Sequence, residues 1–197
     1  MLFHVHQATP QCEVFNFLNS ELLHFLFASI MSEGFSEALF RAHANAPSVC
    51  WSNQSTREKF HELWKALPKD SQGRQSLFDT ISNAQDPQIF FTDTETVLPV
   101  LEPASLFEAM KALTTHLFTR TKDLAGTKLQ AGSSIETHYQ QFINSNSDLC
   151  PLCGTAQLAQ NRAHLDAEDQ WRADYDHLLC KDKYPIYSAH PGNFVPT

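Results

Sequence analysis

The stretch Phe15-Asn-Phe-Leu-Asn-Ser-Glu-Leu-Leu-His-Phe-Leu-Phe-Ala-Ser-Ile30 decides the fold class of this chain. Apolar residues occupy most faces of a helix drawn through it. That distribution is typical of a buried helix and not of one that lies on the surface. The sequence therefore predicts a mainly helical region that begins with a buried helix.

Helical patterns continue outward from this stretch to about residue 146. Ser55 and Glu58 form a capping-box pattern before apolar residues at helical spacing, and Pro68 ends that helix. Ser133 and Glu136 repeat the pattern before the last predicted helix. Three more helices are predicted to start after Ser36, Asp70 and Pro103.

Two segments interrupt the helical pattern. Residues 89–91 and 97–101 are predicted to be short strands or extended connectors, because they are short apolar runs near prolines. Residues 125–133 are polar and contain glycine, which makes them the best linker in the sequence. We expect two domains, a helical one that docks a partner over 1–146 and a small one over 147–197.

Length and charge limit what this chain can do alone. Its 197 residues suffice for one domain or two small ones. With 14 Lys and Arg against 22 Asp and Glu, the net charge of -8 argues against a self-sufficient nucleic-acid binder, because phosphate contacts need basic side chains. No apolar run approaches the roughly 18 residues of a membrane span, and no signal-peptide pattern is present, so we expect a cytoplasmic protein without a membrane partner.

A cysteine pair opens the C-terminal region. In Cys150-Pro-Leu-Cys153-Gly154 the spacing lets both thiolates bind one tetrahedral zinc ion, and the glycine permits a tight turn. A redox pair or an incidental pair of thiols are the alternatives, although no thioredoxin-like βαβ pattern surrounds it. The odd total of five cysteines fits reduced thiols or metal ligands better than a disulfide framework.

Further polar residues follow at the end of the chain, in the segments Asp176-His177, Lys181-Asp-Lys-Tyr-Pro185 and Asn193-Phe-Val-Pro196. A carboxylate can hold a hard divalent cation, and an imidazole can deprotonate water. Adjacent side chains on a strand point to opposite sides unless the strand ends there. An asparagine can hydrogen-bond the backbone across a loop.

In this order, the cysteine pair, the Asp-His pair, the Lys-x-x-Tyr-Pro loop and Asn-Phe-Val-Pro resemble the HNH endonuclease family over residues 148–197. The resemblance implies a small ββα-metal module after the helical domain, with a hairpin built around Tyr175 and Phe194. It also implies the activity of an enzyme, the metal-dependent hydrolysis of phosphodiester bonds.

The resemblance assigns a role to each matching residue. His177 is expected to be the general base that activates water, and Asp176 a ligand of the catalytic magnesium or manganese ion. Asn193 is expected to hold the active-site loop and thereby orient His177. Cys150 and Cys153 are expected to form half of a structural zinc site.

Two lysines and two substitute ligands complete the expected site. Lys181 and Lys183 are expected to place the phosphate, although a solvated charged turn explains them equally well. Cys180 and His164 are weaker alternatives as additional zinc ligands. His4 and His6 form a further weak metal pair near the start of the chain.

The sequence departs from the family pattern in two ways. It ends at Thr197, where the family continues into a second cysteine pair and a helix, so we expect a truncated module, with an inactive relative as the alternative. Residues 150–197 also hold four Lys and Arg against six Asp and Glu, so a partner is expected to bring the nucleic acid, DNA more than RNA.

The architecture suggests one more specific setting and two alternatives. A short HNH protein with a helical front end resembles the nuclease subunits of anti-phage defence systems, of Septu type or associated with retrons, which work with an ATPase subunit. The first alternative is a catalytically inactive, zinc-stapled interaction module with an HNH-like fold. The second is a thiol oxidoreductase that uses the cysteine pair.

Overall fold

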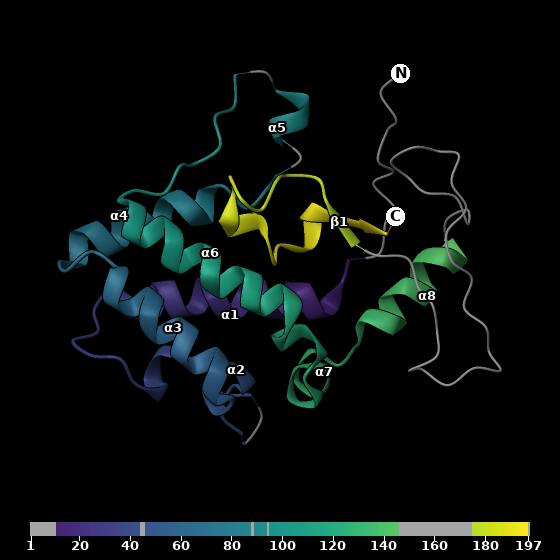
Figure 1. The fold of residues 1–197 in the computed structure, drawn as a ribbon, viewed down its shortest axis with the longest axis horizontal. Helices are drawn as coiled ribbons and strands as arrows, with labels where there is room; N and C mark the ends of the chain where they lie inside the picture. The colour runs from purple at the N-terminus through teal and green to yellow at the C-terminus, as the bar shows by residue number, and fades with distance from the viewer. Residues whose placement is uncertain (1–10, 44–45, 88, 94, 146–174, 197) are drawn as a thin grey trace.

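The computed structural model describes residues 11–43, 46–87, 89–93, 95–145 and 175–196, and these residues are mainly helical. Figure 1 shows the helices side by side, with residues 175–196 lying across them. The helices and strands, in chain order, are α1 (Glu13–Ser29), η1 (Glu37–Leu39), α2 (Val49–Ser52), α3 (Gln54–Ala66), α4 (Ser71–Asn83), α5 (Ile89–Thr92), α6 (Ala104–Thr119), η2 (Thr121–Asp123), α7 (Ala125–Ala131), α8 (Ile135–Ser145), β1 (Tyr175–His177), η3 (Pro185–Tyr187), η4 (Pro191–Asn193) and β2 (Phe194–Pro196).

Helix α1 is buried on most sides, as its sequence predicts. It contacts α4, α7, η1, η2 and η4, and Figure 1 shows it running along the middle of the molecule. Its side chains at Phe15, Leu22 and Phe25 are almost completely buried. The helix ends at Ser29, five residues before the Gly34 that follows it in the sequence.

Helices α3 and α6 form the other main contact of the helical body. The predicted face of α6 is confirmed, because Leu106, Met110, Leu113 and Leu117 are all at most 1% exposed. They lie in the same hydrophobic core as Phe60 of α3. The spacing of these apolar side chains, three or four residues apart, accounts for their common face.

The helix starts differ from the predicted caps by one or two residues. The capping residue of α3 is Asn53 and not Ser55, and its side chain accepts a bond of 3.0 Å from the N–H of Thr56. At α8 the hydroxyl of Ser134, and not that of Ser133, accepts the N–H three residues later at 3.1 Å. Asn53 has the extended backbone conformation that a capping residue requires. The hydroxyl of Ser134 is the one that reaches the free N–H of Thr137.

The predicted linker over 125–133 is wrong, because Ala125–Ala131 forms α7. Thr127 is fully buried, and its hydroxyl donates to the carbonyl of Thr121 at 2.6 Å. Gly132 then ends the helix with a left-handed φ of 64°, a conformation in which a side chain would be strained. Tertiary packing therefore outweighs the polar composition of this segment.

The predicted strand at 89–91 is also wrong, because Ile89–Thr92 forms the single helical turn α5. Residues 97–101 form neither a helix nor a strand, so the short strand predicted there is absent from the described part of the chain. Short apolar runs carry no period that separates a helix turn from a strand. The error therefore lies where the sequence signal is weakest.

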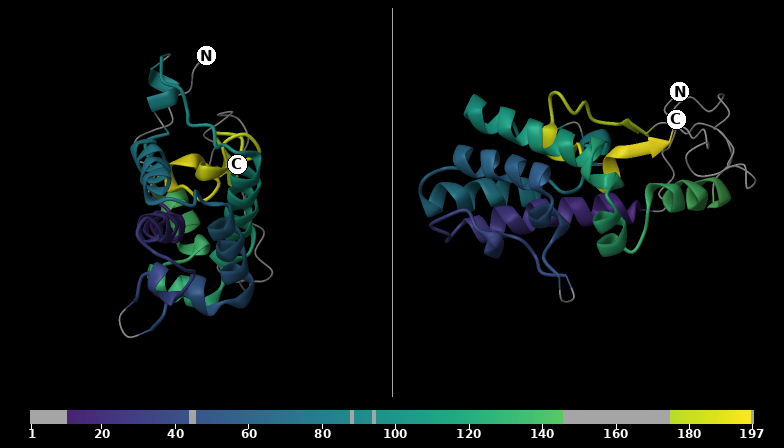
Figure 2. Two further views of the ribbon diagram at one scale, coloured as in Figure 1. Left: turned by 90° about the vertical axis from the view of Figure 1, so that its left-hand side faces the viewer. Right: turned by 60° about the horizontal axis from the view of Figure 1, so that its bottom comes forward.

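Residues 175–196 pack onto the helical body. Strands β1 and β2 pair antiparallel, with His177 opposite Phe194, so the strand pair expected around Tyr175 and Phe194 is present. Leu179, Ile186 and Tyr187 are buried in the same hydrophobic core as α1 and α6. Both views in Figure 2 show this segment against the helices, and the right view shows α8 extending to one side of the body.

Candidate active site

The strand pair positions the sixteen-residue loop between its two strands, from Leu178 to Asn193, which ends in the η4 turn. The ladder continues by one bond beyond the strands, because the N–H of Leu178 donates to the carbonyl of Asn193 at 3.0 Å. Inside the loop, the N–H of Tyr184 donates to the carbonyl of Cys180 at 2.9 Å, which closes a tight turn. The loop is thus a chain of short turns held at both ends.

Asn193 holds this loop from within. Its side chain is fully buried, and its Oδ1 accepts the N–H of Leu179 at 2.7 Å. Its Nδ2 donates to the carbonyls of Leu179 and Tyr187 at 3.2 and 2.9 Å. One carboxamide therefore ties both ends of the loop together and satisfies backbone groups that burial would otherwise leave unpaired.

The same loop is fastened to the end of helix α4. The hydroxyl of Tyr187 donates to the carbonyl of Ala84 at 2.8 Å. His190 is buried beside it, and its Nδ1 accepts the N–H of Gly192 at 3.1 Å. Burial is the main reason that the pKa of His190 falls to about 4, so this imidazole is neutral near pH 7.

His177 ends strand β1 and is half-buried. Its Nε2 lies 3.2 Å from the carbonyl oxygen of Ser188. Because a carbonyl only accepts hydrogen bonds, this contact requires the proton on Nε2 and leaves the lone pair of a neutral ring on Nδ1. Burial is the main cause that lowers the pKa of His177, and the nearby Lys181 lowers it further.

Two phenylalanines contact the ring of His177. The ring centroid of Phe118, in α6, lies 4.5 Å away, and that of Phe194, in β2, lies 4.9 Å away. Both phenylalanines also stack on Phe15 of α1, at 5.5 and 4.1 Å. The sequence gives no signal for the Phe118 contact, because it joins residues far apart in the chain.

Asp176 is exposed, next to the half-buried His177. Among the described residues, none forms a hydrogen bond or an ion pair with the carboxylate of Asp176, so its oxygens are open to a ligand. Within the described part of the chain, no group of three or more His, Cys, Asp and Glu side chains could hold a metal ion. A single exposed carboxylate nevertheless fits magnesium, which is commonly held by one or two carboxylates together with waters and substrate phosphates.

The predicted phosphate-binding lysines lie on the loop beside His177. The Nζ of Lys181 is 5.9 Å from the centre of the Phe118 ring, and that of Lys183 is 5.2 Å from the ring of Tyr184. Between them, Asp182 forms an ion pair of 2.9 Å with Lys111 of α6. Both ammonium groups lie over aromatic rings, and Lys181 is close enough to His177 to lower its pKa.

Of the predicted zinc ligands, only the alternative Cys180 lies among the described residues. Cys150, Cys153 and the alternative His164 lie outside the described residues, as do His4 and His6. Cys180 lies within them and is an exposed free thiol.

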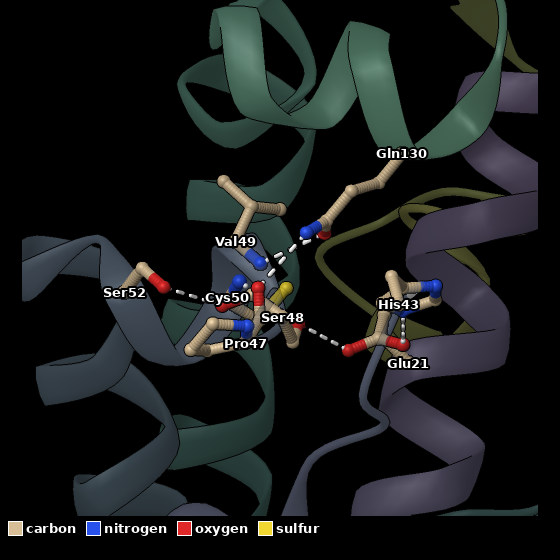
Figure 3. Close-up of polar contacts among 8 residues, drawn as sticks. All are labelled: Glu21, His43, Pro47, Ser48, Val49, Cys50, Ser52 and Gln130. Carbon is tan, nitrogen blue, oxygen red and sulfur yellow. Dashed lines mark hydrogen bonds and ion pairs between the residues drawn. The ribbon is translucent and has the colours of Figure 1, made fainter. Parts of the chain in front are cut away.

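A second cluster of polar side chains was not anticipated from the sequence. Glu21, in the middle of α1, is only 1% exposed, and its carboxylate lies between two partners (Figure 3). Its Oε1 is 2.8 Å from Nε2 of His43, and the hydroxyl of Ser48 donates to its Oε2 at 2.5 Å. A glutamate inside an apolar run is the one sequence signal that points to it, because buried carboxylates need partners.

The order of this cluster does not match a nucleophilic triad. In such a triad the histidine lies between the serine and the carboxylate, whereas here the carboxylate is in the middle. Ser48 is also 1% exposed, and its oxygen caps α2 by accepting the N–H of Cys50 at 3.1 Å. Burial raises the pKa of the Cys50 thiol, which keeps it protonated. The cluster therefore links α1 to the start of α2.

Among the described residues, no helix is both long and apolar enough to cross a membrane. Comparison with known protein families, with characterised proteins and with solved structures finds no match to this chain. The resemblance to the HNH endonucleases consequently depends on the motif residues and on the geometry described above.

Proposed function

We propose that this chain is a metal-dependent nuclease subunit of HNH type that hydrolyses phosphodiester bonds in DNA. The observation that carries this proposal is the hydrogen bond between Nε2 of His177 and the carbonyl of Ser188, 3.2 Å long. A general base needs a neutral ring with one free nitrogen aimed away from its anchor. This contact provides such a ring at the position that the motif assigns to the base.

In the proposed reaction, Nδ1 of His177 accepts the proton of the attacking water. The lowered pKa of His177, caused mainly by burial, keeps the ring unprotonated near pH 7. Asn193 ties the loop on which Ser188 lies and so fixes the anchor of the ring. The base therefore keeps one orientation while substrate binds and leaves.

Asp176 would hold the divalent cation, magnesium or manganese, and its exposed carboxylate is open to solvent. When bound, such a cation stabilises negative charge on the phosphate and on the leaving oxygen. Lys181 would contact the phosphate next to the scissile bond, because it lies on the same loop as the anchor of His177. A structural zinc ion held by Cys150 and Cys153 completes the proposal.

The acidic net charge of -8 suggests how the nuclease reaches its substrate. Binding to DNA alone would be weak, because neutralisation of phosphates supplies most of the affinity. We infer that a protein partner, an ATPase subunit of an anti-phage complex in the cytoplasm, docks on the helical region and brings the DNA. This extends the nuclease proposal and depends on it.

The second proposal is a catalytically inactive interaction module with an HNH-like fold. It is favoured by the burial of Tyr187 and Phe194, which makes the loop part of the hydrophobic core. A segment that serves mainly as packing would tolerate the loss of Asp176, whereas a metal ligand would not.

Cleavage of supercoiled plasmid in magnesium or manganese distinguishes the two proposals. We expect the wild-type chain, with its partner, to nick the plasmid and to stop when EDTA is added. Asp176→Asn should lower the rate at least about a hundredfold, because it removes the charge that binds the cation. The matched control is Asp79→Asn, which changes an exposed carboxylate on α4. Equal rates for wild type and Asp176→Asn, or no cleavage by wild type in either metal, would reject the nuclease proposal.

A further inference from the structure

Two phenylalanines from different parts of the chain contact the ring of His177, and a third, Phe15, packs on both of them. Phe194 lies opposite His177 on β2. Phe118 comes from the last turn of α6 and contacts the ring at 4.5 Å with an interplanar angle of 55°. Phe118 and Phe194 stack on each other at 5.3 Å with an angle of 14°, and Phe15 of α1 stacks on both.

These contacts limit the orientation of the imidazole. The second side-chain torsion of a histidine has a broad energy well, so one hydrogen bond of 3.2 Å leaves the ring free to tilt. Phe118 and Phe194 stack on each other, and together they contact the imidazole from one side, at 4.5 and 4.9 Å. They restrict this tilt, because tilting toward them would cause overlap and tilting away would lose dispersion contacts. The ring therefore has three constraints, which are the Ser188 carbonyl, Phe194 and Phe118.

Phe118 differs from the other two constraints in its origin. Ser188 and Phe194 lie in the loop and strand of the motif, whereas Phe118 belongs to the helical body. The Nζ of Lys181 also lies 5.9 Å from the centre of the Phe118 ring. One side chain of the helical body thus contacts both the proposed base and a proposed phosphate ligand.

We propose that Phe118 is a positioning residue for His177, so that helix α6 forms one wall of the active site. This inference rests on the proposed nuclease function. It predicts that the helical region does more than dock a partner, because the base is aligned only when the loop lies against α6.

The position of Phe118 makes the proposal testable without unfolding the chain. Phe118 is only partly buried, whereas its neighbour Leu117 is fully buried and holds α6 in the core. Phe118→Leu keeps most of the apolar volume and removes the flat ring. Phe118→Tyr keeps the ring and serves as the conservative variant. Phe78→Leu is the matched control, because Phe78 is also partly buried on a helix and has one ring contact, with Phe27 at 5.4 Å.

The first measurement needs no activity. The side-chain proton resonances of His177, assigned by their loss in His177→Gln, are compared at one fixed pH in the wild type and the variants. Ring currents from a phenylalanine at 4.5 Å displace these resonances, so we expect them to move in Phe118→Leu and to stay in place in Phe78→Leu. Unchanged resonances in Phe118→Leu would overturn the positioning proposal whatever the activity of the chain.

The second measurement is steady-state plasmid cleavage with the partner present. We expect Phe118→Leu to lower kcat about tenfold and to change KM by less than about twofold, because misalignment of the base affects the chemical step more than binding. Phe118→Tyr should restore kcat to within about twofold of wild type. A kcat that Phe118→Leu leaves at the wild-type value would overturn the proposal.

Two further outcomes are distinguishable. Should Phe118→Leu melt well below the wild type, Phe118→Met is measured in its place, because its flexible side chain fills the gap without a ring. If His177 resonances move but the wild-type chain never cleaves DNA, the nuclease proposal fails, and with it the catalytic meaning of the Phe118 contact.

Discussion

The carboxamide of Asn193 and the backbone of Leu179 form a two-way hydrogen-bonded pair. Oδ1 of Asn193 accepts the N–H of Leu179 at 2.7 Å, and its Nδ2 donates to the carbonyl of the same residue at 3.2 Å. The side chain of Asn193 thus replaces a strand partner for Leu179, at the point where the chain leaves β1. This is the geometry expected of a residue that holds the loop beside His177.

Replacing Asn193 with alanine should destabilise the protein by about 2 to 4 kcal/mol, because it leaves buried backbone N–H and carbonyl groups without partners. Urea denaturation of the two proteins measures this loss. Asn16→Ala is the control, since it removes only an exposed bond of 3.4 Å to Glu13 and should cost less than about 0.5 kcal/mol. Equal stabilities of the two variants would show that Asn193 does not hold the loop.

His190 should make the stability depend on pH. Its pKa is about 4 in the folded protein, mainly because of burial, against 6.5 for an ordinary histidine. Between these values the unfolded chain binds the additional proton, so stability is complete above about pH 6.5 and falls as the pH drops towards 4. From about pH 7.5 to about pH 4.5 this single group accounts for about 2 to 3 kcal/mol.

His190→Asn isolates this effect, because asparagine keeps an acceptor for the N–H of Gly192 and does not titrate. Chemical denaturation at the two pH values should show a loss of stability that is smaller in His190→Asn by that amount. Burial also lowers the pKa of His24, His116 and His177, but these groups are present in both proteins and cancel in the difference. The same pH dependence in both proteins would mean that His190 is not buried in its neutral form.

Ser48 should matter far more for stability than its neighbour Ser52. Ser48→Ala leaves one oxygen of the buried Glu21 carboxylate unpaired and removes the cap of α2, which should cost about 2 to 4 kcal/mol. Ser52→Ala removes a bond of 3.1 Å from an exposed serine on the same helix and should cost less than about 0.5 kcal/mol. Thermal or urea unfolding compares the two, and similar losses would contradict the contacts drawn in Figure 3.

The sequence predicts the helices whose apolar faces are wide or regular. The burial of α1 follows from the apolar residues on most of its faces, and the buried face of α6 from Leu106 to Leu117 follows from the helical spacing of its apolar side chains. The short helices α5 and α7 could not be predicted in this way. Helix α7 is held by a buried hydroxyl contact between Thr127 and Thr121 and by packing against α1, and neither is visible in its local composition.

The candidate site likewise has some features that the sequence predicts and others that only the folded chain shows. The motif points to His177 and Asn193, and the structure places these two residues at opposite ends of the same loop. The motif does not indicate that the backbone carbonyl of Ser188 binds the ring of His177, because every residue has a carbonyl. Phe118 and the Glu21 cluster depend on contacts between distant segments, so only the folded chain reveals them.

The central claim, that His177 is the general base, is tested most directly by the cleavage rate of His177→Ala. Single-turnover nicking of plasmid in magnesium or manganese is measured with the partner present, against wild type and against His61→Ala, a histidine that stacks on Phe35 away from the loop. The account predicts a rate at least about a hundredfold lower for His177→Ala alone, partly restored by added imidazole, because the free base replaces the missing ring. A His177→Ala rate equal to that of wild type would contradict it.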